Sequence, residues 1–127
     1  MAPSDHARFY SSFCITLNLM RGEMVAYGWC LSGRFFEVAA CDTPLLTDGW
    51  QGLDTFFVPW RELLTAGCAE DVEEALEMPD SALQSMAARA RERTLDQHTG
   101  HVRAVQLLKY LEEAISHNRA SLKTEVA

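Results

Sequence analysis

The chain has 127 residues, of which 48% are hydrophobic, enough for one small globular domain with its own core. Eleven basic and 18 acidic residues give a net charge of −7, which disfavours nucleic acid and anionic membranes as general partners. No apolar run approaches the roughly 18 residues that cross a bilayer, and no signal-peptide pattern opens the sequence, so we expect a cytoplasmic protein.

The first half of the chain alternates between helical and strand patterns. A capping Ser4 or Asp5 predicts a short helix over residues 5–11. Residues 13–19, FCITLNL, alternate apolar side chains and predict a strand. Residues 21–27 predict one or two helical turns that end at Gly28.

A helix and two more strands follow in the pattern. Ser32 stands where it can cap a helix over residues 33–41, which is apolar nearly all round and is therefore predicted to be buried. TPLLT, residues 43–47, is typical of an internal parallel strand. LDTFF, residues 53–57, predicts a short helix, and ELLTA, residues 62–66, predicts a third strand.

From about residue 72 onward the chain is predicted to be helical. Apolar side chains recur at helical spacing in three groups, separated at Pro79 and near Gly100. The groups are Val72, Ala75 and Leu76, then Leu83, Met86, Ala87, Ala90 and Thr94, then Ala104, Leu107, Leu108, Leu111 and Ile115. The arginine-rich run 89–93 is expected to be a solvated helix face. Residues 119–127 are expected to be a flexible tail.

The order of these elements predicts an α/β fold, with about three parallel strands flanked by helices and a helical C-terminus. Three parallel strands amount to half of a doubly wound, Rossmann-like domain, and at least one edge of such a sheet is left unpaired.

Cysteines and histidines do not predict a metal or redox site. The spacing of Cys14, Cys30, Cys41 and Cys68 matches neither kind of motif, and we expect buried, reduced thiols. The histidines at 98 and 101 lack further ligands nearby in the sequence, so no metal is predicted. Trp50 is expected to pack on Phe56 or Phe57 rather than to stack on a base.

The segment SGRFFE, residues 32–37, carries the chemistry of interest. Ser32 and Gly33 present free backbone N–H groups at a predicted helix start, which suits a phosphate, and Arg34 adds a cation. Glu37 lies one turn further in, and an unpaired carboxylate in a core costs several kcal/mol. It is therefore exposed, paired or turned toward a ligand. An ordinary pair between Arg34 and Glu37, at i and i+3, is one alternative.

Four segments in order carry a resemblance to a known family: HARFYSS, TLNLMRGEMVAYG, SGRFFEVAACDTPLLTDGWQGLDTFF and RERTLDQHTGHVRAVQLL. Together they resemble the C-terminal part of spore-maturation CgeB-like glycosyltransferases, group 1 enzymes of the GT-B fold. The resemblance implies that Glu37 holds the ribose of a nucleotide-sugar donor and that Ser32, Gly33 and Arg34 face its diphosphate. Arg21 and Glu23 match a polar pair after the first strand, and a structural ion pair is the alternative for these two.

Three departures limit what the resemblance implies. Asp42 stands where the family has glycine, and Trp29 stands where the broader group has a second glutamate near the transferred sugar. The acceptor-binding domain and the front half of the donor domain have no counterpart, so residues 1–118 are expected to be a partial donor-binding domain and catalysis by it alone is uncertain.

Two functions follow as expectations. The first is a module that binds a nucleotide sugar, with no metal and no other cofactor, as a homodimer or with a partner chain that supplies the missing half. The second is a non-catalytic interaction subunit or truncated remnant that pairs through its exposed sheet edge.

Overall fold

The computed structural model describes residues 3–125 of the chain. These residues belong to two compact units, Met1–Leu95 and Asp96–Ala127, and each is described by itself. The first unit holds a parallel sheet and the helices around it, and the second is helical. No helix among the described residues is both long enough and apolar enough to span a membrane.

The sheet has three parallel strands in the order β1, β2, β3. These are β1 (Thr16–Asn18), β2 (Leu45–Thr47) and β3 (Leu64–Thr65). All three residues of β2 are buried, as expected for an internal parallel strand. The predicted α/β class is therefore confirmed, although β1 is shorter than the alternating pattern of residues 13–19.

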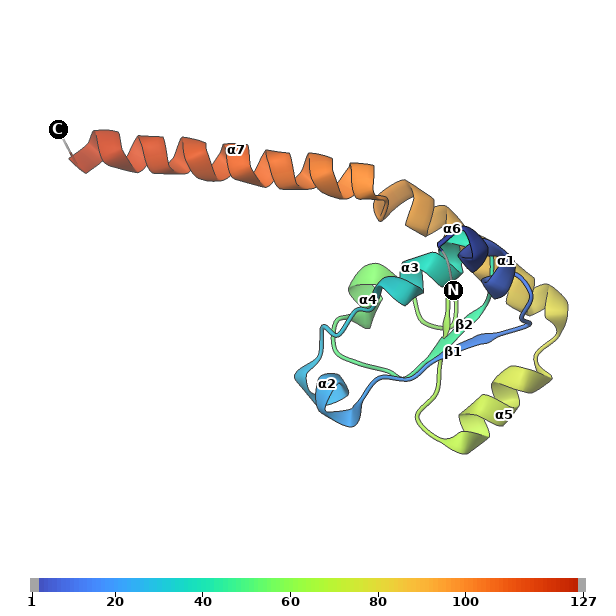
Figure 1. Cartoon of the computed structure of the whole chain (residues 1–127). Coiled ribbons are helices and arrows are strands. Elements are labelled where there is room, and N and C mark those ends of the chain that lie inside the picture. Colours follow the sequence, from blue (N-terminus) through green and yellow to red (C-terminus); the bar gives the residue numbers. More distant parts are fainter. Residues whose placement is uncertain (1–2, 126–127) are drawn as a thin grey trace. The chain divides into compact units, whose positions relative to one another are not determined.

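Helices cover both faces of the sheet. Successive residues of a strand point to opposite sides, so neighbouring residues of β2 pack in different core clusters. Leu45 packs in one core cluster with α3 (Gly33–Ala40), and Leu46 packs in another with α5 (Ala69–Glu77). Figure 1 shows α3 and α5 on opposite sides of the strands. The first cluster comprises Tyr10, Cys30, Phe35, Val38, Ala39, Leu45, Trp50, Leu53, Phe57, Leu63 and Ala90. The second comprises Leu46, Leu64, Ala66, Ala75, Leu83 and Met86.

Short helices complete the first unit. They are η1 (Pro3–Asp5), α1 (His6–Tyr10), α2 (Gly22–Tyr27) and α4 (Leu53–Phe56). The predicted helices over residues 5–11, 21–27 and 53–57 are confirmed to within a few residues. Trp50 is buried and its ring centroid lies 6.3 Å from that of Phe56, as predicted.

The prediction that α3 is buried all round is wrong. Phe35 and Val38 are fully buried, whereas Arg34 and Glu37 are exposed, so the helix is amphipathic. The sequence pattern predicted burial on every side because the exposed face also carries Ala40, an apolar residue that is too small to require burial.

The prediction of a solvated arginine face on α6 (Asp80–Gln97) holds for Arg91 and Glu92, which are exposed, but not for Arg89 and Arg93, which are half-buried. Arg89 Nε donates to the Arg61 carbonyl at 2.7 Å, and Arg91 Nε donates to the carbonyl of Ala40, the last residue of α3, at 3.3 Å. Arg93 lies 3.5 Å from the buried Glu62 carboxylate. These arginines therefore tie α6 to the sheet domain, through partners that are 28 or more positions away in the sequence.

All four cysteines are free, but only Cys30 is buried. Cys41 is partly buried, and Cys14 and Cys68 are exposed, so the prediction of buried thiols fails for these two. Neighbouring apolar residues do pack in or against the second core cluster, Ile15 beside Cys14 and Ala66 near Cys68, so apolar neighbours in the sequence did not imply burial of the thiols themselves.

The second unit contains the end of α6 and α7 (Gly100–Glu125). The helix boundary predicted near Gly100 is confirmed, since α6 ends at Gln97 and α7 begins at Gly100. The flexible tail over residues 119–127 stays a prediction, and residues 126–127 lie outside the described part of the chain.

Candidate functional site

A cavity of about 380 Å³ lies at the carboxyl end of β1, where ligands bind in parallel α/β sheets. We call it the β1-end pocket. It is lined by Asn18, Leu19, Met20, Arg21, Met24, Leu31, Ser32 and Arg34. The structure thus brings together three residues predicted for the site, Arg21 from the start of α2 and Ser32 and Arg34 from the start of α3. The volume is within the range of small-molecule sites.

Ser32 caps α3 as predicted. Its hydroxyl accepts a hydrogen bond from the Arg34 backbone N–H at 3.3 Å, and its backbone is extended. The Phe35 N–H donates to the Ser32 carbonyl at 3.1 Å, so the N–H of Gly33 is the group of the first turn that helix geometry leaves without an intrahelical acceptor. The helix dipole places partial positive charge at this end. Space for a ligand exists at Gly33, where an added Cβ would meet no atom within 4 Å.

Arg34 extends from the first turn of α3 toward β1. Its Nη1 lies 3.4 Å from the side-chain oxygen of Asn18, a buried residue at the end of that strand. This contact orients the guanidinium at the mouth of the β1-end pocket and leaves most of its donors available. Arg34 is the one predicted residue whose charge, position and surroundings all favour an anion.

Asn18 and Asp48 were missed by the sequence analysis. The Asp48 carboxylate accepts from the Met20 backbone N–H, at 3.2 Å to either oxygen, and thereby fixes the loop after β1. The Thr47 hydroxyl donates to the Asn18 carbonyl at 2.8 Å across the same two strands. The available signal was position: each polar residue stands at or just after the end of a strand.

Glu37 does not occupy the buried position expected for it. Its side chain is 49% exposed, and one carboxylate oxygen lies 3.6 Å from His6 Nδ1 on α1. Arg34 contacts Asn18 rather than Glu37, so the structure does not show the intrahelical pair considered as the alternative. Glu37 lies on the exposed face of α3, one turn beyond Arg34.

Arg21 and Glu23 separate in the structure. Arg21 is the N-cap residue of α2 and lines the β1-end pocket, whereas Glu23 lies in the first turn of α2 and is exposed. No ion pair joins the two among the described residues. Arg21 therefore lies at the candidate site, whereas Glu23 does not line it.

The turn that ends α3 explains the glycine of the family pattern. Asp42 adopts a left-handed backbone with φ of 58°, and its N–H donates to the Ala39 carbonyl at 3.0 Å. Glycine enters this conformation without steric cost. The turn into β2 is formed despite the substitution. In the same turn, partial burial and the nearby Glu37 carboxylate raise the pKa of the Cys41 thiol.

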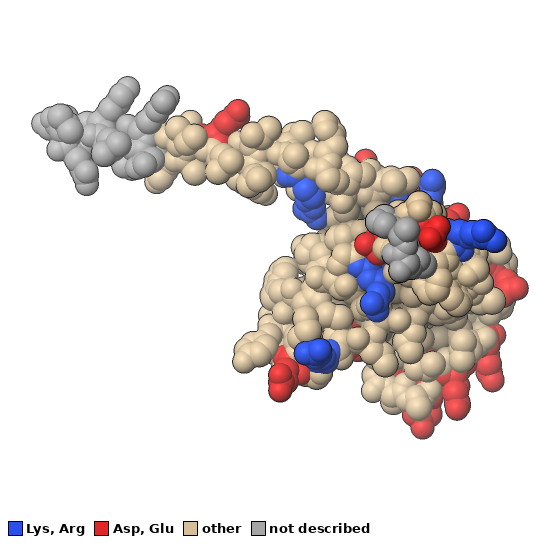
Figure 2. All heavy atoms as spheres, in the orientation of Figure 1, with Lys and Arg blue, Asp and Glu red and all other residues tan. Residues whose placement is uncertain are grey.

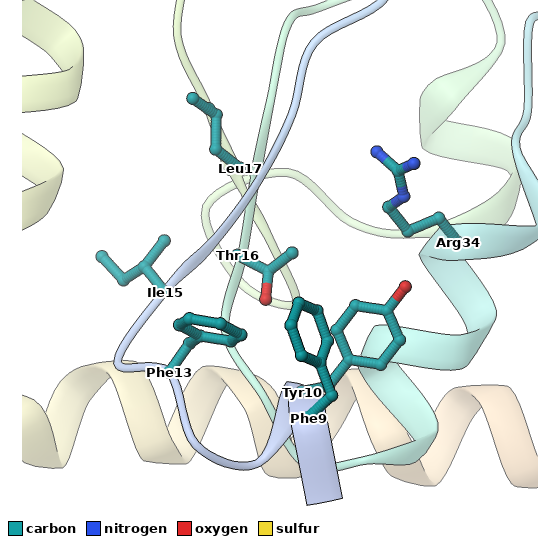
Figure 3. A pocket seen from close by; sticks show the side chains of 7 residues that line it. All are labelled: Phe9, Tyr10, Phe13, Ile15, Thr16, Leu17 and Arg34. Atoms are coloured by element: carbon teal, nitrogen blue, oxygen red, sulfur yellow. The ribbon is translucent and has the colours of Figure 1, made fainter. Parts of the chain in front are cut away.

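A second, more apolar cavity of about 490 Å³ lies at the outer edge of β1. We call it the edge pocket, and it is lined by Phe9, Tyr10, Phe13, Ile15, Thr16, Leu17 and Arg34. Figure 3 shows Thr16 on the side of the strand that faces Tyr10 and Arg34, and Ile15 and Leu17 on the other side. The pocket therefore straddles the strand edge, with Arg34 between it and the β1-end pocket.

Charge is distributed unevenly over the first unit. Acidic side chains gather over α5 on the face shown in Figure 2. Backbone hydrogen bonds from Gly67 and Cys68 at the start of α5 lower the pKa of Asp71. Among the described residues, no group of three metal-binding side chains is present. The β1-end pocket is thus the place where positive charge and a helix start coincide.

One comparison with known proteins identifies a family. A family model described as glycosyl transferase-like matches residues 1–109. No curated protein and no solved structure matches the chain.

Proposed function

The chain belongs to this glycosyl transferase-like family, and on that premise we propose that it binds a nucleoside diphosphate sugar at the β1-end pocket. The finer assignment to the CgeB-like type, and to the GT-B donor domain, rests on the motifs in residues 6–108 and is part of the proposal. Binding of the donor is assigned to this chain, and binding of the acceptor to a further polypeptide segment.

The observation that carries the proposal is the position of Arg34. A guanidinium, a capped helix start and a second arginine, Arg21, converge on one cavity at the carboxyl end of a parallel strand. A diphosphate carries charges that each of these groups stabilises. In a transfer reaction, negative charge grows on the departing diphosphate, and Arg34 with the helix start would stabilise it without a metal.

We also propose that Glu37 holds the ribose, although its carboxylate is exposed rather than buried. An exposed carboxylate requires no ligand for its own stability, so burial no longer supports the assignment. What supports it is the family motif and its location one turn past Arg34 on the exposed face of α3. Two carboxylate oxygens can accept hydrogen bonds from the two ribose hydroxyls.

Calorimetry on the full chain with UDP-, GDP- and TDP-sugars tests the proposal. We expect one base to bind, and we expect Arg34→Ala to weaken binding at least tenfold because charge-assisted hydrogen bonds to phosphate are lost. Glu37→Ala should weaken it about tenfold, and Glu37→Gln less, since one acceptor remains.

Matched controls remove the same charges elsewhere. Arg8→Ala on α1 and Glu74→Ala on α5 alter exposed residues that line neither pocket. Both should bind like the wild type. Absence of binding at millimolar ligand, or equal losses in Arg8→Ala and Arg34→Ala, would count against the proposal.

The edge pocket favours a second candidate function, the pairing of β1 with a strand of another polypeptide. Thr16 N–H bonds to Pro44 next to β2, so the alternate residue Leu17 directs its backbone groups to the open edge. Phe9, Phe13 and Leu17 are each more than 40% exposed there. Sedimentation shows whether the wild type self-associates and whether Leu17→Lys abolishes that. A wild-type monomer that copurifies with no other chain would weaken this candidate.

A further inference from the structure

Asn18 is a deeply buried polar residue in the wall of the β1-end pocket. It is 2% exposed and is the last residue of β1, opposite Thr47 in the register of the sheet. The Thr47 hydroxyl donates to the Asn18 carbonyl at 2.8 Å, so the neighbouring strand holds its backbone in place. Burial of a carboxamide is costly unless its polar atoms are hydrogen-bonded. Its side chain therefore needs partners in the pocket wall or in a ligand.

The carboxamide oxygen of Asn18 is the acceptor for Arg34. Arg34 Nη1 lies 3.4 Å from this oxygen, and a guanidinium has only donors, so the contact fixes which end of the amide faces the arginine. Arg34 itself is exposed, and ordering a long side chain costs conformational entropy. The contact is longer than the usual N–H···O range of about 2.7–3.2 Å. Asn18 therefore directs the guanidinium toward the pocket and leaves it free to approach a ligand.

The NH₂ group at the other end of the Asn18 amide lacks a strong acceptor. Its nitrogen lies 3.5 Å from the sulfur of Met20, which also lines the β1-end pocket. In the part of the chain that the structure describes, this sulfur is its one acceptor, and a thioether accepts only weakly. A methionine side chain is flexible enough to move aside. A buried donor in the pocket wall is therefore available to a ligand oxygen that takes the place of the sulfur.

Asp48 supports the loop after β1 without lining the pocket. Its carboxylate accepts the Met20 backbone N–H at 3.2 Å to either oxygen. The Met20 backbone is therefore fixed, and its side chain can move independently of it. A carboxylate in the pocket wall would repel a phosphate, but the wall contains two arginines, Arg21 and Arg34, and no acidic residue. The surroundings of the Asn18 NH₂ group thus favour an anionic acceptor.

We propose that Asn18 is both a binding and a positioning residue of the phosphate site, and this rests on the proposed function. Its carboxamide oxygen directs Arg34, and its NH₂ group donates to an oxygen of the same diphosphate. One planar side chain then aligns a charged and a neutral donor on one anion. Because Asn18 is held within the sheet, this alignment exists before the ligand arrives, which lowers the entropic cost of binding.

The test follows the side-chain NH₂ signals of Asn18 by NMR in the labelled full chain. The probes are inorganic pyrophosphate, UDP, GDP and TDP. With each probe that binds, we expect one of the two NH₂ protons to move downfield, because it enters a charge-assisted hydrogen bond. The NH₂ signals of Gln84, an exposed residue outside the β1-end pocket, should stay in place. The measurement uses the wild type, so it does not depend on whether a variant folds.

Asn18→Leu removes the carboxamide and keeps a side chain of similar size. We expect it to weaken pyrophosphate and the matching nucleoside diphosphate roughly tenfold in calorimetry, because a donor to phosphate is lost and Arg34 loses its acceptor. Thr43→Val is the matched control. Thr43 is also 2% exposed and donates to the Cys41 carbonyl, but it precedes β2, at the opposite end of the strand from the pocket. This variant should bind within about twofold of the wild type.

The outcomes separate the role of Asn18 from the proposed function. Binding of a nucleotide without movement of the Asn18 NH₂ signals, or equal affinities of Asn18→Leu and Thr43→Val, overturns the role of Asn18 and leaves the proposed function standing. Binding of pyrophosphate with the expected movement, but of no nucleotide, supports the role of Asn18 and counts against a nucleotide sugar. Binding of no probe by the wild type overturns both.

Discussion

At the scale of single residues, Asp42 shows why the family pattern has a glycine at the end of α3. Its φ of 58° puts an L-residue in the left-handed region at the end of α3, and its carboxylate opposes the negative end of the helix dipole. We expect Asp42→Gly to raise the free energy of unfolding by about 0.5–1 kcal/mol. Urea denaturation measures this, with Asp42→Asn separating charge from conformation. Equal or lower stability of Asp42→Gly would show that the turn does not strain the wild type.

Sequence patterns predict the local contacts of the site but not the contacts between distant residues. Ser32 was predicted as a helix cap because capping depends on neighbours two or three residues away. The hydrogen bond from the Met20 N–H to the Asp48 carboxylate spans 28 positions, and no local sequence pattern predicts it. Exposure of Glu37 depends on which face of α3 meets the sheet, which the apolar sequence leaves undefined.

At the scale of elements, the start of α5 carries a pH dependence. The Asp71 carboxylate accepts the Gly67 N–H at 2.6 Å and the Cys68 N–H at 3.2 Å, which lowers its pKa in the folded chain. A lowered folded-state pKa means stabilisation that is present above the unfolded value near 3.8 and lost as pH falls through the folded value.

We therefore expect Asp71→Ala to be less stable than the wild type at neutral pH, with the gap closing as the pH falls below about 4. Thermal unfolding of the two proteins across pH 2–7 measures the gap. Glu74→Ala, on the same helix, should track the wild type throughout. A gap that stays constant with pH would mean that Asp71 acts only through helix propensity.

Element types were largely predictable, because hydrophobic periodicity differs between helix and strand. The internal strand β2 and the helices α5 to α7 follow their patterns closely. Failures occurred where tertiary contact decides the outcome. The arginines of α6 were predicted to form a solvated face, yet Arg93 pairs with the buried Glu62 carboxylate and Arg91 donates to the last carbonyl of α3.

At the scale of the whole molecule, the three-stranded parallel sheet, the match to a glycosyl transferase-like family and the positive pocket at the end of β1 are consistent with one another. The open edge of β1 provides a surface for further structure, and the edge pocket shares Arg34 with the β1-end pocket. A strand added at that edge would therefore pack beside the proposed phosphate site. On this view the two candidate functions are compatible.

The most direct measurement is amide NMR of the labelled full chain, titrated with UDP, GDP and TDP. The account predicts that one nucleotide shifts the signals of residues 32–35, at the start of α3, and of residues 18–21, in the loop after β1. Those shifts should vanish in Arg34→Ala. Shifts confined to the edge pocket or to α5, or no shifts at millimolar nucleotide, would contradict it.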